Sequence, residues 1–200
     1  MIKKQALKLS LGLANNNVIA KDSQAVYTYG FELLISAFIN ILLMIIISIA
    51  FRNCYAWILF LASFIPLRTT AGGYHANSHA KCILVTAMSF TILLLFSRLS
   101  LDWTTIVLST AIISLLLILL LSPVEAKNKK LNKMRRGKNR LISIFLGIVN
   151  LLIAGIAIFI IEGYVELLVN YFAGVFAAAL SMLVAKTVQI YERRFRNEKV

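Results

Sequence analysis

Long runs of apolar residues dominate this chain of 200 residues. A helix needs about 20 apolar residues to cross the hydrocarbon core of a bilayer. Five runs reach that length, and they cover residues 31–51, 83–101, 103–122, 141–161 and 164–185. A sixth run, residues 54–67, reaches only about 21 Å as a helix, so it must borrow neighbouring residues to span. We predict an all-α, polytopic membrane helix bundle of about six transmembrane helices; five spans and a re-entrant segment are the alternative.

The start of the chain has a different pattern, in which apolar residues recur at helical spacing beside lysines. The apolar positions are Ile2, Ala6, Leu9 and Leu13, and the lysines are Lys3, Lys4 and Lys8. This pattern is typical of a helix that lies on an anionic membrane surface. No compact apolar run with a small-residue cleavage site follows, which argues against a signal peptide. We therefore predict an interfacial amphipathic segment over residues 1–22, with a solvated terminus as the alternative.

Composition and charge placement agree with a membrane protein and orient it. Hydrophobic residues make up 60% of the chain and charged residues 14%, whereas soluble domains average roughly 45–50% and 25%. Most basic residues of this +13 chain fall in the N-terminus, the loops 68–82 and 123–140, and the C-terminal tail. The positive-inside rule places such segments in the cytoplasm. We expect a multi-pass cell-membrane protein that forms one integral membrane domain over residues 1–200, with both termini and both loops cytoplasmic.

The loop 68–82 concentrates the reactive side chains of the chain. It reads RTTAGGYHANSHAKC and holds both histidines, one of the two cysteines and a glycine pair. A thiolate is the nucleophilic form of cysteine, and a nearby imidazole or cation favours it. Arg68 supplies positive potential, while Gly72 and Gly73 allow close backbone approach and can present N–H groups to an oxyanion. The loop predicts nucleophilic catalysis by Cys82.

Two other roles for this cysteine compete with catalysis. A cysteine beside a membrane helix is often a small buried side chain or a palmitoylation site. Two histidines and a cysteine are also possible zinc ligands, but the loop lacks a fourth ligand and a Cys-x-x-Cys pair. We therefore expect neither a metal nor another cofactor.

Two histidines are candidates for the general base. His79 lies three residues before Cys82, which on a helix brings their Cβ atoms to about 5–6 Å. His75 lies seven residues before Cys82, about 10.5 Å along a straight helix, so it reaches the thiol only if the chain bends. Spacing alone slightly favours His79. Glu32, at the start of the first span, is an auxiliary candidate that pairs with Arg68, orients His75 or faces water at the interface.

The loop 123–140 carries a dense positive charge, with eight basic residues. Each such charge contributes about 1 kcal/mol to attraction by an anionic membrane, and the same charges suit an acidic peptide; the two roles are compatible. A nucleic acid is not expected, because no aromatic residue interrupts the run to stack on a base. The residues proposed to bind an acidic peptide tail are Lys127, Lys129, Lys130, Lys133, Arg135 and Arg136.

Three sequence blocks together resemble the accessory gene regulator B family of membrane cysteine peptidases, which act in Gram-positive quorum sensing. The blocks are YGFE at 29–32, the loop 68–82, and SPVEAKNKKL at 122–131. The resemblance covers most of the chain, in order and at the family's spacing. It implies that His75 and Cys82 form the catalytic pair, with Arg68 and Gly73 in support. The family often has an aromatic or bulky residue near position 79, where this chain has a second histidine.

The same resemblance implies a function. It indicates a cysteine endopeptidase that removes the C-terminal part of a quorum-sensing propeptide and, through a thioester acyl-enzyme, promotes cyclisation to a thiolactone or lactone autoinducing peptide. Its partners would be a precursor with an amphipathic front and an acidic tail, anionic membrane lipids, and a second copy in a homodimer. The alternative is a small-solute or peptide transporter. A transporter would need ionisable groups deep in several spans, whereas residues 103–122 carry no charged residue.

Overall fold

The computed structural model describes residues 2–74, 78–99, 102–125, 132–160 and 165–197. These residues form seven α-helices and one short 3-10 helix at Lys21–Ser23. The α-helices are α1 (Ile2–Asn15), α2 (Gln24–Ala50), α3 (Ala56–Ala71), α4 (His79–Phe96), α5 (Trp103–Leu121), α6 (Lys133–Ile160) and α7 (Val165–Asn197). The described ranges contain no strand beyond one isolated bridge. The predicted all-α helix bundle is confirmed.

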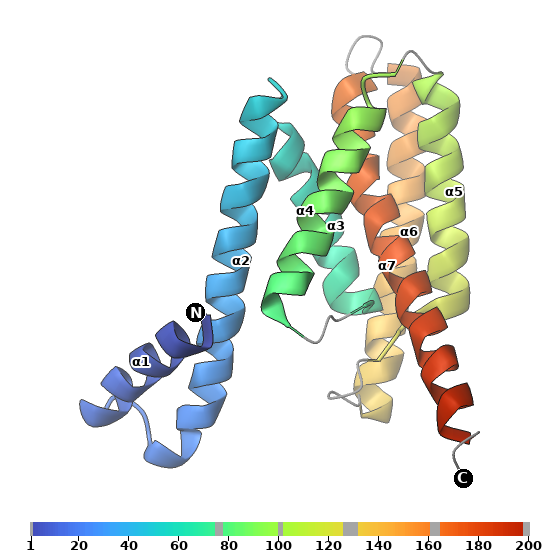
Figure 1. The fold of residues 1–200 in the computed structure, drawn as a ribbon. Coiled ribbons are helices and arrows are strands. Elements are labelled where there is room, and N and C mark those ends of the chain that lie inside the picture. The colour runs from blue at the N-terminus through green and yellow to red at the C-terminus, as the bar shows by residue number, and fades with distance from the viewer. Residues whose placement is uncertain (1, 75–77, 100–101, 126–131, 161–164, 198–200) are drawn as a thin grey trace.

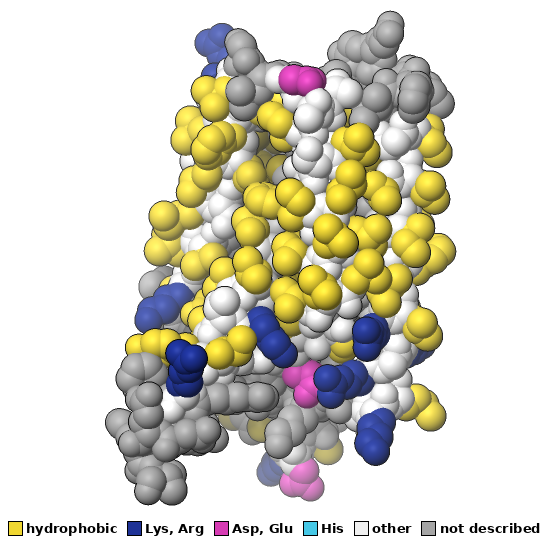
Figure 2. Space-filling view, turned by 90° about the vertical axis from the view of Figure 1, so that its right-hand side faces the viewer, with side chains coloured by type: hydrophobic (Ala, Val, Ile, Leu, Met, Phe, Trp, Pro, Cys, Tyr) yellow, Lys and Arg dark blue, Asp and Glu magenta, His cyan; other side chains and the backbone are white. Residues whose placement is uncertain are grey.

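Helices α2 to α7 alternate in direction, and α1 lies obliquely against the start of α2 (Figure 1). At the lower end of Figure 1, α3, α5 and α7 finish while α2, α4 and α6 begin. We call this the basic end. Lysine and arginine side chains gather mostly there, below a broad band of apolar side chains (Figure 2). This separation is the charge asymmetry that the sequence predicts.

Every predicted apolar run coincides with a helix, although the lengths differ. Four helices of the described residues are long and apolar enough to cross a membrane: α2, α5, α6 and α7. Helices α3 and α4 are shorter, with apolar stretches over Ala56–Ala71 and Ala80–Phe96. Helix α3 extends four residues beyond the end of the run 54–67. Helix α4 starts four residues before the run 83–101 and ends before that run does. The four long helices make this a membrane protein, and full spanning by α3 and α4 stays a prediction.

Helix α7 lies at the centre of the packing, mainly against α3 and α5. Gly174 allows its close approach to α3, since a Cβ there would collide with the carbonyl group of Phe60 and the hydroxyl of Ser63. The Ser63 hydroxyl also donates a 2.6 Å hydrogen bond to the carbonyl oxygen of Tyr171. Small residues and inter-helix hydrogen bonds of this kind hold helices together in lipid, where burial of apolar surface cannot.

Helix α1 packs on α2 through small side chains. Ala6, Ser10 and Ala14 are buried, and the hydroxyl groups of Ser10 and Thr28 are 2.7 Å apart. The opposite surface of α1 exposes both lysines and leucines, namely Lys3, Lys4, Lys8, Leu7, Leu9 and Leu11. The predicted helix is confirmed, and its exposed mixture of cations and leucines suits an anionic membrane surface.

Candidate active site

The glycine pair ends α3 and joins three parts of the chain. Gly72 has a φ of 80° and Gly73 a φ of 144°, values that residues with a side chain rarely adopt. Gly72 bridges Val124, whose N–H donates a 2.9 Å hydrogen bond to the carbonyl oxygen of Ala71. A Cβ on Gly72 would collide with the Val124 backbone. Glycine is therefore required for this contact between the end of α3 and the segment after α5.

Gly73 gives space to an arginine and to α7. A Cβ on Gly73 would collide with the guanidinium of Arg68 and the hydroxyl of Ser181. The next residue, Tyr74, donates its N–H to the carbonyl oxygen of Ser181 at 2.9 Å. The turn after α3 is thus held on one side by Val124 and on the other by α7.

Arg68 lies in the last turn of α3, just beyond the apolar run 54–67. Its Nη2 donates to the carbonyl oxygen of Tyr74, while its Nη1 is buried and has no hydrogen-bond partner within the described part of the chain. Burial lowers the pKa of the Arg68 guanidinium below its ordinary value, and negative charge on Cys82 opposes that shift. The guanidinium is therefore held by the turn that follows α3, through the carbonyl oxygen of Tyr74.

Cys82 lies in the first turn of α4. Ser78 caps this helix, because its hydroxyl accepts a 3.3 Å hydrogen bond from the N–H of Lys81. The N–H of Cys82 donates to the Ser78 carbonyl oxygen at 3.1 Å. Cys82 is a free, half-buried thiol, whereas Cys54 is a free and exposed one.

The structure gives less information on the two histidines and Glu32 than on Arg68 and Cys82. His75 lies outside the described residues, so its predicted pairing with Cys82 stays a prediction. His79 is the first residue of α4, which puts its Cα one turn before that of Cys82. Glu32 lies in the third turn of α2 and is half-buried; its predicted action on Arg68 or His75 also stays a prediction.

Replacing Arg68 by glutamine should slow alkylation of Cys82 by iodoacetamide about tenfold at pH 7, because the role predicted for Arg68 is to favour the thiolate, as cations near a cysteine do. The rate is measured by mass spectrometry in a Cys54→Ser background. Arg98→Gln is the matched control, since Arg98 also donates to a backbone carbonyl of another segment, that of Phe51. Equal rates in Arg68→Gln and Arg98→Gln would contradict this role.

Comparison with known protein families shows to which family this chain belongs. The family model described as accessory gene regulator B matches residues 6–190. The chain belongs to the accessory gene regulator B family. Comparisons with curated proteins and with solved structures give no match. Membership in this family fits a role in the processing of autoinducing peptides in quorum sensing.

The third accessory gene regulator B block, residues 122–131, is described up to Glu125. The carbonyl oxygen of Glu125 accepts a 2.7 Å hydrogen bond from Nε2 of Gln189 on α7. Its carboxylate lies 3.7 Å from Nε of Arg136 on α6. Neither Gln189 nor Ser181 was identified from the sequence, because both are ordinary polar residues of a long helix that is mainly apolar up to residue 185. Only their contacts distinguish them.

The basic residues proposed for the acidic tail are described in part. Lys127, Lys129 and Lys130 lie outside the described residues. Lys133, Arg135 and Arg136 are exposed in the first turn of α6, which begins at the basic end. The accessory gene regulator B chain therefore carries exposed cations at the end of the bundle that also holds Arg68 and the glycine turn.

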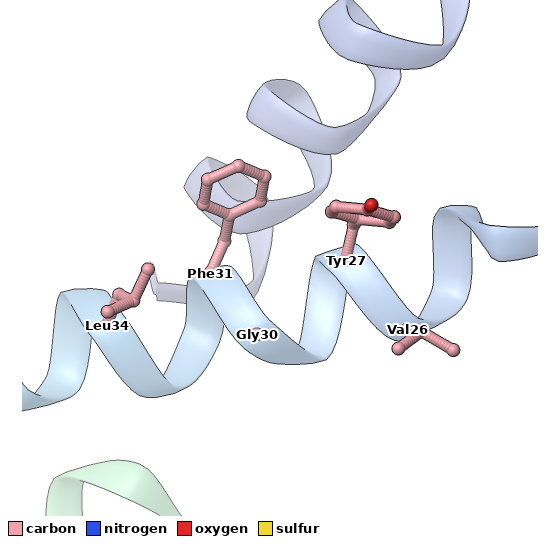
Figure 3. Close-up of a pocket in the computed structure, with 5 residues that line it drawn as sticks. All are labelled: Val26, Tyr27, Gly30, Phe31 and Leu34. Carbon is pink, nitrogen blue, oxygen red and sulfur yellow. The ribbon is translucent and has the colours of Figure 1, made fainter. Parts of the chain in front are cut away.

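An apolar groove of about 170 Å³ lies on α2 (Figure 3). Its lining residues are Val26, Tyr27, Gly30, Phe31 and Leu34. Tyr27 and Phe31 project to the same side of the helix, and Gly30 leaves the space between them open. The groove contains the Gly-Phe of the YGFE block, and its lining includes no cysteine, histidine or carboxylate.

Proposed function

We propose that this protein is a membrane cysteine endopeptidase that cleaves the C-terminal part from a quorum-sensing propeptide and promotes closure of the remaining part into a ring. The observation that carries the proposal is the Arg68 guanidinium, which donates to the carbonyl oxygen of Tyr74 in the glycine turn and keeps a buried Nη1 that has no hydrogen-bond partner among the described residues. A thiol in the first turn of a helix, with a fixed cation beside it, is an arrangement suited to acyl transfer. Family membership supports the same substrate class.

The proposed reaction uses Cys82 as nucleophile and His75 as general base. His75 takes the thiol proton, and the thiolate attacks the scissile carbonyl carbon. Nη1 of Arg68 donates to the resulting oxyanion, where a preorganised donor is most effective; the N–H groups of Gly72 and Gly73 are further donors. The C–N bond then breaks, His75 returns the proton to the leaving amine, and a thioester to Cys82 remains.

Ring closure follows if a Cys or Ser of the bound peptide attacks the thioester before water does. When the attacking group is a thiol, one thioester is exchanged for another. The bond to the Cys82 sulfur breaks, and Cys82 becomes a thiol again with the proton that the peptide thiol lost. Such an exchange is nearly isoenergetic, so the enzyme needs mainly to position the two groups and exclude water. This step rests on family membership, since the site by itself indicates only acyl transfer.

The precursor would be bound at two places. Its acidic tail pairs with the exposed cations that begin α6, and its amphipathic part lies on the membrane beside α1, whose lysines attract anionic lipids. In this arrangement the protein is a multi-pass protein of the cell membrane with its basic end in the cytoplasm, as the positive-inside rule requires.

The mechanism is tested by comparing variants of the two histidines that are candidates for the general base. His75→Ala should reduce release of the C-terminal fragment at least about 100-fold, since general-base catalysis contributes 10²–10⁴. His79→Ala, at the other histidine of the same loop, should change it by less than about threefold. Membranes with each variant are incubated with a precursor peptide that has an amphipathic front and an acidic tail, and fragments are measured by mass spectrometry. Normal processing by His75→Ala would overturn the assignment.

A further inference from the structure

Gln189 holds the backbone that leads from α5 into the loop 123–140. Its side-chain nitrogen donates a 2.7 Å hydrogen bond to the carbonyl oxygen of Glu125. Two turns earlier on the same helix, the Ser181 carbonyl oxygen accepts from the N–H of Tyr74. Helix α7 therefore contacts both connections of the basic end: the one that follows α3 and the one that follows α5.

Glu125 lies between two helices. Its backbone carbonyl group contacts α7, and its carboxylate contacts α6. The ion pair with Arg136 joins side chains that are 29% and 63% exposed, respectively, and at this exposure it contributes at most about 1 kcal/mol. The neighbouring residue Val124 is bound to Ala71 and Gly72. The start of α6 is thus tied, through two consecutive residues, to α7 and to the end of α3.

These ties fix exposed cations relative to the thiol site. Lys133, Arg135, Arg136, Lys138 and Arg140 are all exposed in the first two turns of α6. A long cationic side chain binds an anionic partner more tightly when the backbone that carries it is already held, because less freedom is lost on binding. If the Gln189 hydrogen bond were lost, the weak ion pair with Arg136 would be the one contact of Glu125 left among the side-chain contacts of the described residues.

We propose that Gln189 is a positioning residue for an acidic-peptide site formed by the exposed cations at the start of α6. The inference rests on the proposed function, since it specifies how the tail of the substrate is held beside the thiol. Gln189 acts through the backbone of Glu125 and does not itself contact the peptide.

The test is direct binding of a fluorescein-labelled peptide of eight glutamates to the full chain in phosphatidylcholine nanodiscs. Gln189→Leu, which removes the donor, should weaken the Kd about fivefold, and Gln189→Asn, whose amide is one methylene shorter, should weaken it similarly. Thr187→Val is the matched control on the same helix, because within the described part of the chain the Thr187 hydroxyl bonds to its own helix, at Val184; its Kd should equal that of the wild type.

The salt dependence of binding separates positioning from loss of folded protein. Displaced cations should make the slope of log Kd against log salt concentration shallower, whereas partial misfolding lowers only the binding amplitude. Equal Kd and slope in wild type, Gln189→Leu and Gln189→Asn would overturn the inference. A second result would also overturn it: the wild type fails to bind the peptide, and its cations bind only phosphatidylglycerol when that lipid is added to the nanodiscs. No cleavage occurs in this assay, so loss of the proposed peptidase activity would not change its result.

Discussion

Replacement of Cys82 by serine is expected to abolish release of the C-terminal fragment of the precursor. The thiolate is the proposed nucleophile, and a serine hydroxyl beside the same base is far less ionised. Removal of a nucleophile that acts together with its base usually costs 10³-fold or more, so the fragment should fall by at least about a thousandfold. The measurement is mass spectrometry of the precursor after incubation with membranes that contain the variant.

Cys54→Ser provides the matched control for this loss. Cys54 is the other free cysteine, and it is exposed just after α2 ends, away from the glycine turn. Its variant should process the precursor at the wild-type rate within about twofold. Normal processing by Cys82→Ser would show that this thiol is not the nucleophile, and the proposed acyl-enzyme would have to be abandoned. A covalent adduct between the precursor and Cys82 in the wild type would support it.

Gly73→Ala is expected to cause the second large loss. Its new methyl group would occupy the space of the Arg68 guanidinium and the Ser181 hydroxyl, at a φ of 144°. Backbone strain of this kind costs about 1–3 kcal/mol, and displacement of the guanidinium removes the proposed oxyanion donor. Fragment release should fall about 100-fold, as when one oxyanion donor is lost, and thermal unfolding should begin at a lower temperature.

Gly155→Ala separates this effect from a general intolerance of added methyl groups. Gly155 lies inside α6, and a Cβ there would meet no heavy atom within 4 Å. Alanine is favoured over glycine in a helix by up to about 1 kcal/mol, so this variant should unfold at the same or a higher temperature and process normally. If Gly73→Ala behaved like Gly155→Ala, the contact between the turn and Arg68 would have no bearing on catalysis.

The helices could be predicted from the sequence because apolar length and spacing are local properties. The run 103–122 and helix α5 (Trp103–Leu121) agree within a residue. The position of α4 was harder to predict, because its start depends on the Ser78 cap rather than on apolarity. That cap starts the helix four residues before its apolar run and places Cys82 in the first turn.

The candidate site could be predicted only in part. The loop 68–82 contains Arg68, Gly73 and Cys82, so their proximity was suggested by chain order and by the family's motifs. The contacts with Ser181 and Gln189 could not be predicted, since they join residues that are far apart in the sequence and carry no distinctive chemistry. They arise from the way α7 packs against α3 and α5, which is a property of the folded bundle.

The bridge between Gly72 and Val124 also bears on biosynthesis. The ribosome delivers the thiol long before Val124, and longer still before the α7 residue whose carbonyl oxygen binds Tyr74. A nascent chain would therefore insert with its proposed nucleophile present and the surrounding turn unfinished. Competence for acyl transfer would then arise only when the final helix enters the bilayer, and a product truncated before α7 would remain inert toward precursor.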